Sequence, residues 1–92
     1  MKDVKLFVLN GCPYCRQAFD ALEELKAENA AYKDVPMHVY EEYKDADVVA
    51  KHDYYYAPTM YIGDEKLYEA HPGESYAECK AQVKKVLDQA LN

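Results

Sequence analysis

The chain has 92 residues, a formal net charge of −6, and apolar residues at half of its positions. This length lies near the small end of what one hydrophobic core stabilises, so we expect residues 1–92 to form a single domain. The acidic balance argues against a nucleic-acid partner, which calls for a basic patch. Three cysteines are too few, and odd in number, for a secreted disulfide scaffold.

The N-terminal sequence carries no signal for export. Its apolar run, residues 4–9, is short and contains Lys5, which is not the pattern of a signal peptide. No stretch approaches the length of a membrane span. We therefore expect a soluble, monomeric protein of the cytoplasm with no membrane contact.

The first third of the chain predicts a strand followed by a helix. Residues 4–9 favour a strand buried on both faces of an α/β sheet. Asn10 and Gly11 then favour a sharp turn. A helix is expected from Pro13 to about Asn29, because apolar residues recur there at helical spacing and Asn29 is a stop signal. Its apolar positions are Ala18, Phe19, Leu22 and Leu25.

The middle of the chain predicts a second strand and a short helix. Residues 35–40 alternate with a period of two, and Pro36 limits this strand to an edge or entry position. Asp45 or Asp47 is a suitable cap for a short helix that reaches His52.

The last third predicts a hairpin and a final helix. Residues 57–62 form the third strand, Gly63 and Asp64 turn the chain, and residues 66–68 return. Ser75 with Glu78 three residues later is a capping box, so the last helix begins there and runs to about Leu91. The apolar face of this helix holds Tyr76, Cys79, Val83, Val86 and Ala90.

The expected element order is therefore β-α-β-α-β-β-α. The first two strands are joined through a helix, so they should be parallel with a right-handed crossover. The hairpin should complete a four-stranded mixed sheet, flanked by three helices that cover both faces.

The segment Cys12-Pro13-Tyr14-Cys15 lies where the first strand meets the first helix. A helix N-terminus offers unpaired N–H groups and the positive end of the dipole, which favour a thiolate. Pro13 suits the first helical turn, which places Cys12 at the N-cap, towards solvent, and Cys15 one turn in and more covered. That difference suits a nucleophile and a resolving thiol.

Two other interpretations of the cysteine pair are an inert structural disulfide and half of a zinc site. A zinc site needs two more ligands, usually paired by spacing, whereas Cys79 stands alone and the three histidines are scattered. A Cys-x-x-Cys beside a βαβ pattern favours redox chemistry. We therefore expect no metal site.

With Cys12-Pro13-Tyr14-Cys15 after the first strand and Ala57-Pro58-Thr59 opening the third, the chain resembles the glutaredoxins and small thioredoxin-like proteins over nearly its whole length. The resemblance implies a thioredoxin fold and an enzyme that exchanges dithiols with protein or low-molecular-weight disulfides. Such a protein is an electron carrier in cell redox homeostasis. Cys12 would attack a substrate disulfide and Cys15 would resolve the mixed disulfide, with no bound cofactor.

The same resemblance assigns the substrate-binding residues. Pro58 would follow a cis peptide bond beside the sulfurs, and Ala57 would offer its backbone to an extended substrate segment. Tyr14 would flank the substrate sulfur. Arg16 is a cation close enough to attract an anionic substrate or stabilise the thiolate, or else a solvated helix charge.

The pattern departs from glutaredoxins at the positions that bind glutathione. Their usual cation three residues before the first cysteine is Leu9 here, and their Gly-Gly pair falls on Tyr68 and Glu69. Glutathione is an anion, so the missing cation and the added Glu69 both oppose it. The Tyr68 side chain should also fill the space that glycine leaves open. Glutathione is thus a doubtful reductant, and a thioredoxin-reductase-type flavoprotein is the other candidate for the electron source.

A second hypothesis is a glutaredoxin-like protein that binds a metal or a [2Fe–2S] cluster between two subunits. Pro13 and the poor glutathione pattern argue against it.

Three further groups of residues have expected roles. Cys79 should be a small buried hydrophobe. The histidines should lie at the surface or at an interface, with His71 the one to compare with the sulfurs. Of residues 54–56, all tyrosines, at least one should pack in the core and the others should form an aromatic rim for a protein partner. The other two histidines, His38 and His52, are expected at the surface or at an interface as well.

Overall fold

The computed structural model describes all of residues 1–92 and has the expected order of elements. It adds one short 3-10 helix, η1, that the sequence pattern did not predict. The elements are β1 (Val4–Val8), α1 (Pro13–Glu28), η1 (Ala30–Asp34), β2 (Met37–Glu41), α2 (Ala46–Val49), β3 (Thr59–Ile62), β4 (Glu65–Glu69) and α3 (Tyr76–Leu91).

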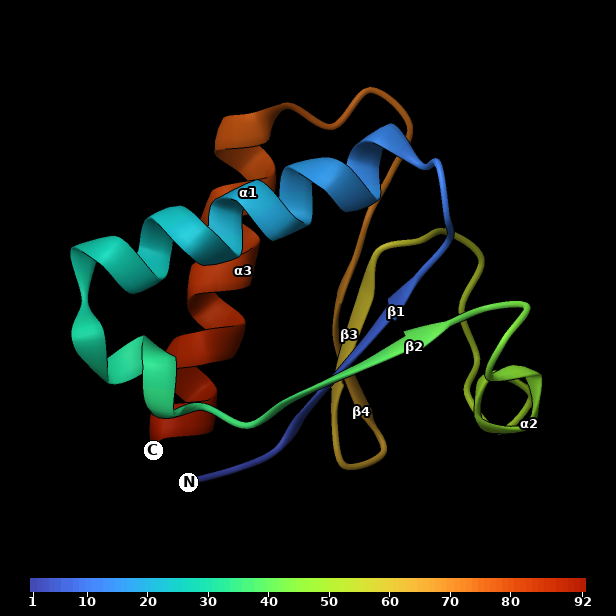
Figure 1. Ribbon diagram of the computed structural model, residues 1–92, viewed down its shortest axis with the longest axis horizontal. Helices are drawn as coiled ribbons and strands as arrows, with labels where there is room; N and C mark the ends of the chain where they lie inside the picture. The colour runs from blue at the N-terminus through green and yellow to red at the C-terminus, as the bar shows by residue number, and fades with distance from the viewer.

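The four strands form one mixed sheet in the order β2-β1-β3-β4 (Figure 1). β1 runs parallel to β2, because α1 returns the chain to the end of the sheet where β1 began. β1 runs antiparallel to β3. Leu6 at the centre of β1 is opposite Val39 on one side and Met60 on the other. β2 is an edge strand, as Pro36 indicated.

The β3–β4 hairpin turns through Gly63 and Asp64 alone. Gly63 has φ +60° and Asp64 does not have a positive φ. This is the pattern of a type II′ turn, whose first central position favours glycine and whose twist matches that of the flanking strands. The strand pairing shifts register between Met60 and Tyr61, which pair with Tyr68 and Lys66, so the extra residue of the bulge is Leu67 in β4.

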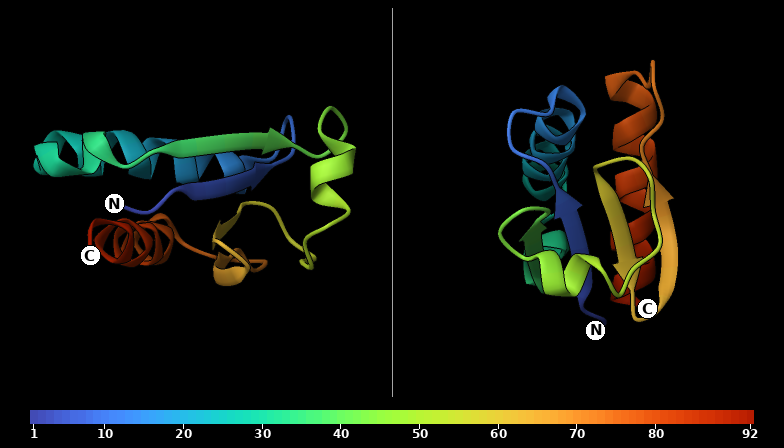
Figure 2. Two further views of the ribbon diagram at one scale, coloured as in Figure 1. Left: turned by 90° about the horizontal axis from the view of Figure 1, so that it is seen from below. Right: turned by 90° about the vertical axis from the view of Figure 1, so that its right-hand side faces the viewer.

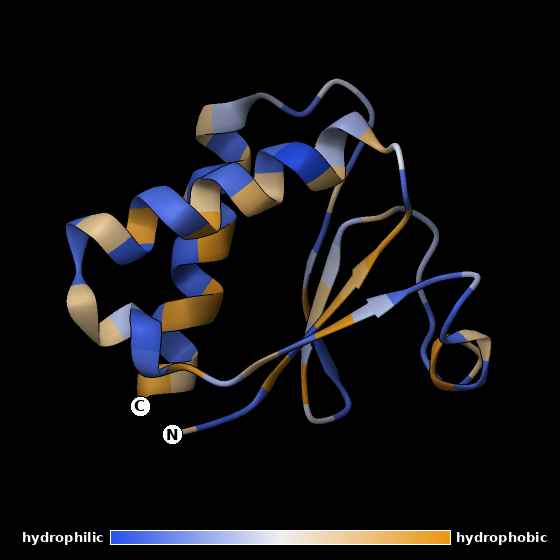
Figure 3. Cartoon of the chain, viewed as in Figure 1, coloured by the Kyte–Doolittle hydropathy of each residue, from blue (hydrophilic) through white to orange (hydrophobic).

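The helices cover the two faces of the sheet unequally (Figures 1 and 2). α1 and α3 pack against each other on one face, whereas the other face is covered by the short α2 and the loop that follows it. Alternate residues of a strand point to opposite faces, so Val4, Leu6 and Val8 face the two long helices. Hydrophobic residues gather on β1 and along α3 (Figure 3). The helical residues of this core include Ala18, Leu22, Leu25, Val83, Val86 and Leu87.

The second face of the sheet is built around Phe7, which is fully buried. Its ring lies 4.7 Å from the His52 ring and 5.3 Å from the Tyr54 ring, measured between centroids. His52 also lies 2.7 Å from the Lys5 ammonium nitrogen. His52 is thus half-buried, so the expected surface or interface position is met only in part. An imidazole is flat enough to stack on aromatic rings and polar enough to bond the lysine.

Local sequence signals explain where α1 ends and where α3 begins. α1 ends at Glu28, and the Asn29 side chain accepts a hydrogen bond from the Ala31 N–H at 3.0 Å, which starts η1. α3 begins with the predicted capping box, in which Ser75 and Glu78 bond each other's backbone N–H groups. None of the helices has the length and apolar character that crossing a bilayer requires.

Candidate active site

Cys12 lies at the N-cap of α1, where the loop from β1 enters the helix. Its backbone is extended, with φ −82° and ψ 120°, and Pro13 is the first helical residue, as expected. The thiol is half-buried and donates a hydrogen bond to the Ala57 carbonyl at 3.6 Å. We expected the sulfur to lie at the free N–H groups of the helix. It caps none of them and lies against the Ala57 carbonyl instead.

Cys15 is nearly inaccessible to solvent, with 3% of its surface exposed. The Leu9 N–H donates to its sulfur at 3.4 Å. Burial above all, together with the neighbouring Cys12 and Glu42, raises the pKa of the Cys15 thiol to about 12, although the Leu9 N–H acts in the opposite direction. Cys15 therefore carries its proton at neutral pH. The predicted contrast between an accessible thiol and a covered one is confirmed.

The loop before β3 lies directly against Cys12. The peptide bond between Ala57 and Pro58 is cis, as expected, and Pro58 is fully buried. The Pro58 carbonyl accepts from the Ala70 N–H at 3.0 Å, which ties the loop to the end of β4. The Ala57 N–H makes no hydrogen bond within the chain. This edge of backbone is thus left open beside the thiol.

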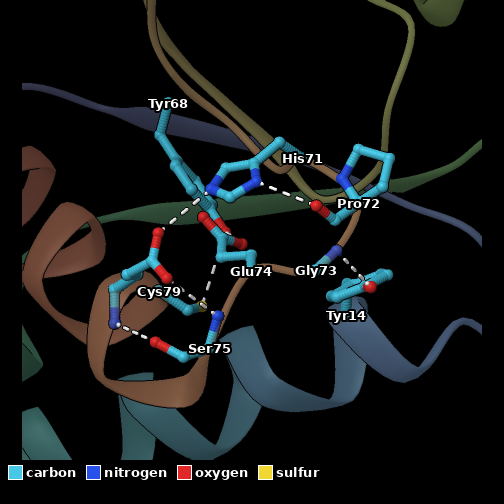
Figure 4. Close-up of polar contacts among 9 residues, drawn as sticks. Tyr14, Tyr68, His71, Pro72, Gly73, Glu74, Ser75 and Cys79 are labelled. Atoms are coloured by element: carbon cyan, nitrogen blue, oxygen red, sulfur yellow. Dashed lines mark hydrogen bonds and ion pairs between the residues drawn. The ribbon is translucent and has the colours of Figure 1, made fainter.

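Tyr14 connects the cysteine turn to the loop between β4 and α3 (Figure 4). Its hydroxyl accepts a hydrogen bond from the Gly73 N–H at 2.8 Å. Gly73 has φ +83°, a left-handed conformation that glycine adopts without strain. The bond uses an oxygen lone pair and fixes the position of the hydroxyl, whose own proton stays available to donate. Tyr14 thus holds two loops of the site together.

Arg16 lies at the mouth of a groove beside Cys12. Its side chain is 83% exposed and approaches Asp20 only at 3.9 Å. The groove has a volume of about 400 Å³. Its lining comes entirely from the end of β1, the following loop and the first part of α1: Val8, Leu9, Asn10, Gly11, Cys12, Pro13, Cys15, Arg16 and Phe19. Arg16 is the only charged residue among them.

The positions that match the glutathione-binding glycines of glutaredoxins lie elsewhere than expected. The Tyr68 ring is buried, and its hydroxyl donates to Glu74 at 2.6 Å and approaches the Cys79 sulfur at 3.4 Å (Figure 4). It does not fill space beside Cys12, so that argument against glutathione is wrong. The residue alternation of β4 points this side chain inward. The Glu69 carboxylate accepts from the N–H groups of Tyr55 and Tyr56, at 2.5 and 2.8 Å, and so supports the loop before Pro58.

The remaining predicted residues are mostly outside the site. Cys79 is fully buried, as expected, and burial raises the pKa of its thiol. His71 bonds Glu78 and the Pro72 carbonyl rather than either sulfur of the cysteine pair. His38 is exposed, 3.7 Å from Asp3. No group of three or more His, Cys, Asp or Glu side chains is arranged to hold a metal ion.

Residues 54–56 divide as expected between core and surface. Tyr54 packs on Phe7, whereas Tyr55 is 89% exposed and Tyr56 is 51% exposed. The exposed pair leads into the Ala57–Pro58 bond and so stands at the same end of the molecule as Cys12.

Sequence reasoning missed Glu42, which lies close to the covered thiol. The Val8–Leu9 peptide group links them, since its carbonyl accepts from the Glu42 N–H at 3.0 Å and its N–H donates to Cys15. The Glu42 carboxylate accepts from the Tyr54 hydroxyl at 3.2 Å. A signal was present, because parallel strands end at the same edge of a sheet and Glu42 follows β2 directly.

Comparisons with known proteins agree with this geometry. The family model described as "Glutathione S-transferase, N-terminal domain" matches residues 6–80. The solved structure of the first two thioredoxin domains of Saccharomyces cerevisiae Eps1p is similar with a TM-score of 0.59 and 16% sequence identity. The alignment covers 94% of this chain and 36% of that one, so the present chain spans about a third of its length. No curated protein matches the chain in sequence.

The structural likeness establishes the fold, and the family match covers most of the chain. The expected thioredoxin-like architecture, a four-stranded mixed sheet with three helices, is confirmed. The comparisons support a thioredoxin-like protein, and they do not single out the glutaredoxins. The chain belongs to the family of glutathione S-transferase N-terminal domains.

Proposed function

We propose that this protein is a thiol–disulfide oxidoreductase that works by dithiol exchange. One observation carries the proposal: two thiols one helical turn apart, of which Cys12 is accessible at a helix N-terminus and Cys15 is buried behind it. Inert cysteines do not require this arrangement, whereas a nucleophile and a resolving thiol do.

The reaction takes place in two exchange steps. The Cys12 thiolate attacks one sulfur of a substrate disulfide, the substrate S–S bond breaks, and the first substrate thiolate leaves and takes up a proton. Cys15 then loses its proton and attacks the Cys12 sulfur. The second substrate thiol is released, and Cys12 and Cys15 are left joined in a disulfide. Two electrons pass from the protein to the substrate.

The open Ala57 backbone supports a protein substrate. An extended segment can place its carbonyl against the unpaired Ala57 N–H while its cysteine meets Cys12. The exposed rings of Tyr55 and Tyr56 extend the same surface, and tyrosine is common at protein interfaces. Disulfide-bearing proteins are therefore the proposed partners.

The proposal is tested with three cysteine variants and a protein disulfide as substrate. Cys12→Ser should lose all reductase activity, because the attacking sulfur is gone. Cys15→Ser should accumulate mixed disulfides that mass spectrometry detects as substrate adducts on Cys12. Cys79→Ser is the matched control, because this buried thiol lies outside the site, and it should retain activity. Full activity of Cys12→Ser would disprove the mechanism.

The electron source is the second part of the proposal. We propose that a thioredoxin-reductase-type flavoprotein or glutathione reduces the Cys12–Cys15 disulfide, in a monomeric electron carrier of the reducing cytoplasm. Leu9 in place of a cation weakens the case for glutathione. Efficient reduction by a thioredoxin reductase, with no glutathione adduct in mass spectra of the oxidised protein, would identify the flavoprotein route.

A glutathione-dependent activity is the other candidate, and the family match favours it. The buried position of Tyr68 removes one objection, because its ring does not obstruct the space beside Cys12. A glutathione adduct on Cys12 with turnover of a glutathionylated substrate would favour this candidate. Conjugation of reduced glutathione to an electrophile, with no covalent adduct on Cys12, would instead indicate a transferase.

A further inference from the structure

The groove beside Cys12 contains apolar surface and one cation. It can therefore contact the side chains that flank a substrate's reacting cysteine in sequence. Cys12, Arg16 and Phe19 are spaced four and three residues apart, so they follow one face of α1. Phe19 is 39% exposed although it is a large hydrophobic residue. Leu9 and Pro13 complete the apolar lining.

The groove is separate from the backbone that meets the attacked segment. None of its lining comes from the loop of Ala57 and Pro58 or from the loop before α3. Its volume of about 400 Å³ lies towards the low end of the range of about 300 to 1,000 Å³ seen for ligand pockets. That space suits a few side chains rather than a folded domain.

The charge of the groove differs in sign from that of the whole molecule. The chain carries a net charge of −6, yet the only charged residue in the groove is Arg16. Its guanidinium has one ion-pair partner, Asp20 at 3.9 Å, and both side chains are mostly exposed, so the pair is weak and can be exchanged for another carboxylate. The Asn10 side-chain amide makes no hydrogen bond within the chain, while its backbone N–H donates to the Glu41 carboxylate at 3.5 Å. A weakly paired guanidinium and a free amide beside apolar surface are complementary to a carboxylate next to an apolar side chain.

We propose that this groove is a specificity site for disulfide substrates whose reacting cysteine is flanked by an apolar and an acidic residue. The apolar side chain packs on Leu9 and Phe19, and the carboxylate pairs with Arg16. This inference rests on the dithiol exchange proposed above and adds the class of peptide that is exchanged fastest.

The test uses three symmetric peptide disulfides of equal length. The first has Glu and Leu beside its cysteine, the second has Lys and Leu, and the third has Glu and Gly. The measured quantity is the second-order rate constant with which each peptide oxidises the reduced protein. Each constant is divided by that of mercaptoethanol with the same peptide, which removes the peptide's own reactivity. The readouts are the Glu-to-Lys ratio and the Leu-to-Gly ratio.

Arg16→Gln should lower the Glu-to-Lys ratio about three- to tenfold. Arg16 attracts the Glu peptide and repels the Lys peptide, and the variant loses both effects, which are modest at an exposed cation. Lys26→Gln is the matched control, because it removes the same charge from α1 at a residue outside the groove. It should leave the ratio unchanged. Equal shifts in both variants would mean a general effect of net charge and would overturn the proposal, as would no shift in either.

Phe19→Gln should lower the Leu-to-Gly ratio by about three- to tenfold, because the leucine of the peptide no longer buries its surface against the Phe19 ring. Val39→Thr is the control, since Val39 is 47% exposed but lies outside the groove. If the wild-type protein reacts with all three peptides at equal normalised rates, the specificity site is disproved and the exchange mechanism stands. If no peptide oxidises the protein, the exchange mechanism itself fails.

Discussion

At the scale of single residues, the two thiols of the cysteine turn have opposite surroundings. Cys12 is partly open and meets a carbonyl, whereas Cys15 is enclosed and accepts a backbone N–H. Burial is the main reason that Cys15 keeps its proton. In the exchange proposed above this proton would have to leave before Cys15 attacks, so the residues around it, Glu42 among them, would bear on the second step and not on the first.

Tyr14→Phe removes the hydroxyl that accepts from the Gly73 N–H. The free energy of unfolding should fall by about 0.5 to 1 kcal/mol, because the freed N–H lies at the surface and water replaces its partner. Hydrogen exchange of the Gly73 amide should become faster, while that of the Ala70 amide, bonded to Pro58, should not change. Unchanged exchange at Gly73 would contradict the bond.

At the scale of elements, helix ends show how local signals become structure. In α3 the side chains of Ser75 and Glu78 satisfy N–H groups that the helix itself leaves free. In α1 the cap position is occupied by Cys12, whose side chain satisfies none. One helix therefore begins with a stabilising cap, and the other begins with the cysteine that we propose as the nucleophile.

Ser75→Ala should lower the free energy of unfolding by about 1 kcal/mol, the usual cost of losing a side-chain cap. Ser75→Asn is the matched control, because asparagine caps helices about as well as serine does. Urea denaturation of the two variants measures the difference. Equal stability of Ser75→Ala and wild type would mean that the box contributes nothing.

Local signals predicted the helices, strands and turns better than they predicted which side chains from different elements contact one another. The turn at Gly63, the cap at Ser75 and the edge position of β2 each follow from residues close in sequence. By contrast, the aromatic contacts of His52 depend on residues from other elements. Glu42 reaches the covered thiol only because β1 and β2 are parallel. Spacing along the chain alone does not give the contacts of His52, whereas the expected parallel pairing of β1 and β2 was enough to place Glu42 near Cys15.

The inward position of Tyr68 has the same origin. An alignment by family placed it beside the sulfurs, but which face a strand residue occupies depends on pleat and register. β4 pairs with β3 across a bulge, so counting residues back from the turn does not give the face directly.

At the scale of the whole molecule, the raised pKa of Cys15 makes the stability of the reduced protein depend on pH. The thiol has an ordinary pKa of 9.0 and a folded pKa of about 12. Between these values the unfolded chain releases a proton that the folded chain keeps. Stability is therefore full below pH 9.0 and falls above it, by up to about 1.4 kcal/mol per pH unit.

Urea denaturation of the reduced protein, set against Cys15→Ala, isolates this effect. The difference in unfolding free energy between the two proteins should shrink by about 1 kcal/mol from pH 9 to pH 10. The titrating groups remote from Cys15 are common to both proteins and cancel. Parallel pH profiles would mean that Cys15 titrates alike in the folded and unfolded chains.

The first and last residues of the described chain lie next to each other, where the Lys2 N–H donates to the Ala90 carbonyl at 2.9 Å. Figure 1 shows both ends at the side of the molecule remote from the loop that carries Cys12, because β1 runs from one to the other. Attachment to a bead or a carrier protein through either end therefore leaves the thiol facing solution. A short peptide joining the two ends would allow the chain to be reopened at the hairpin turn, with the cysteine turn untouched.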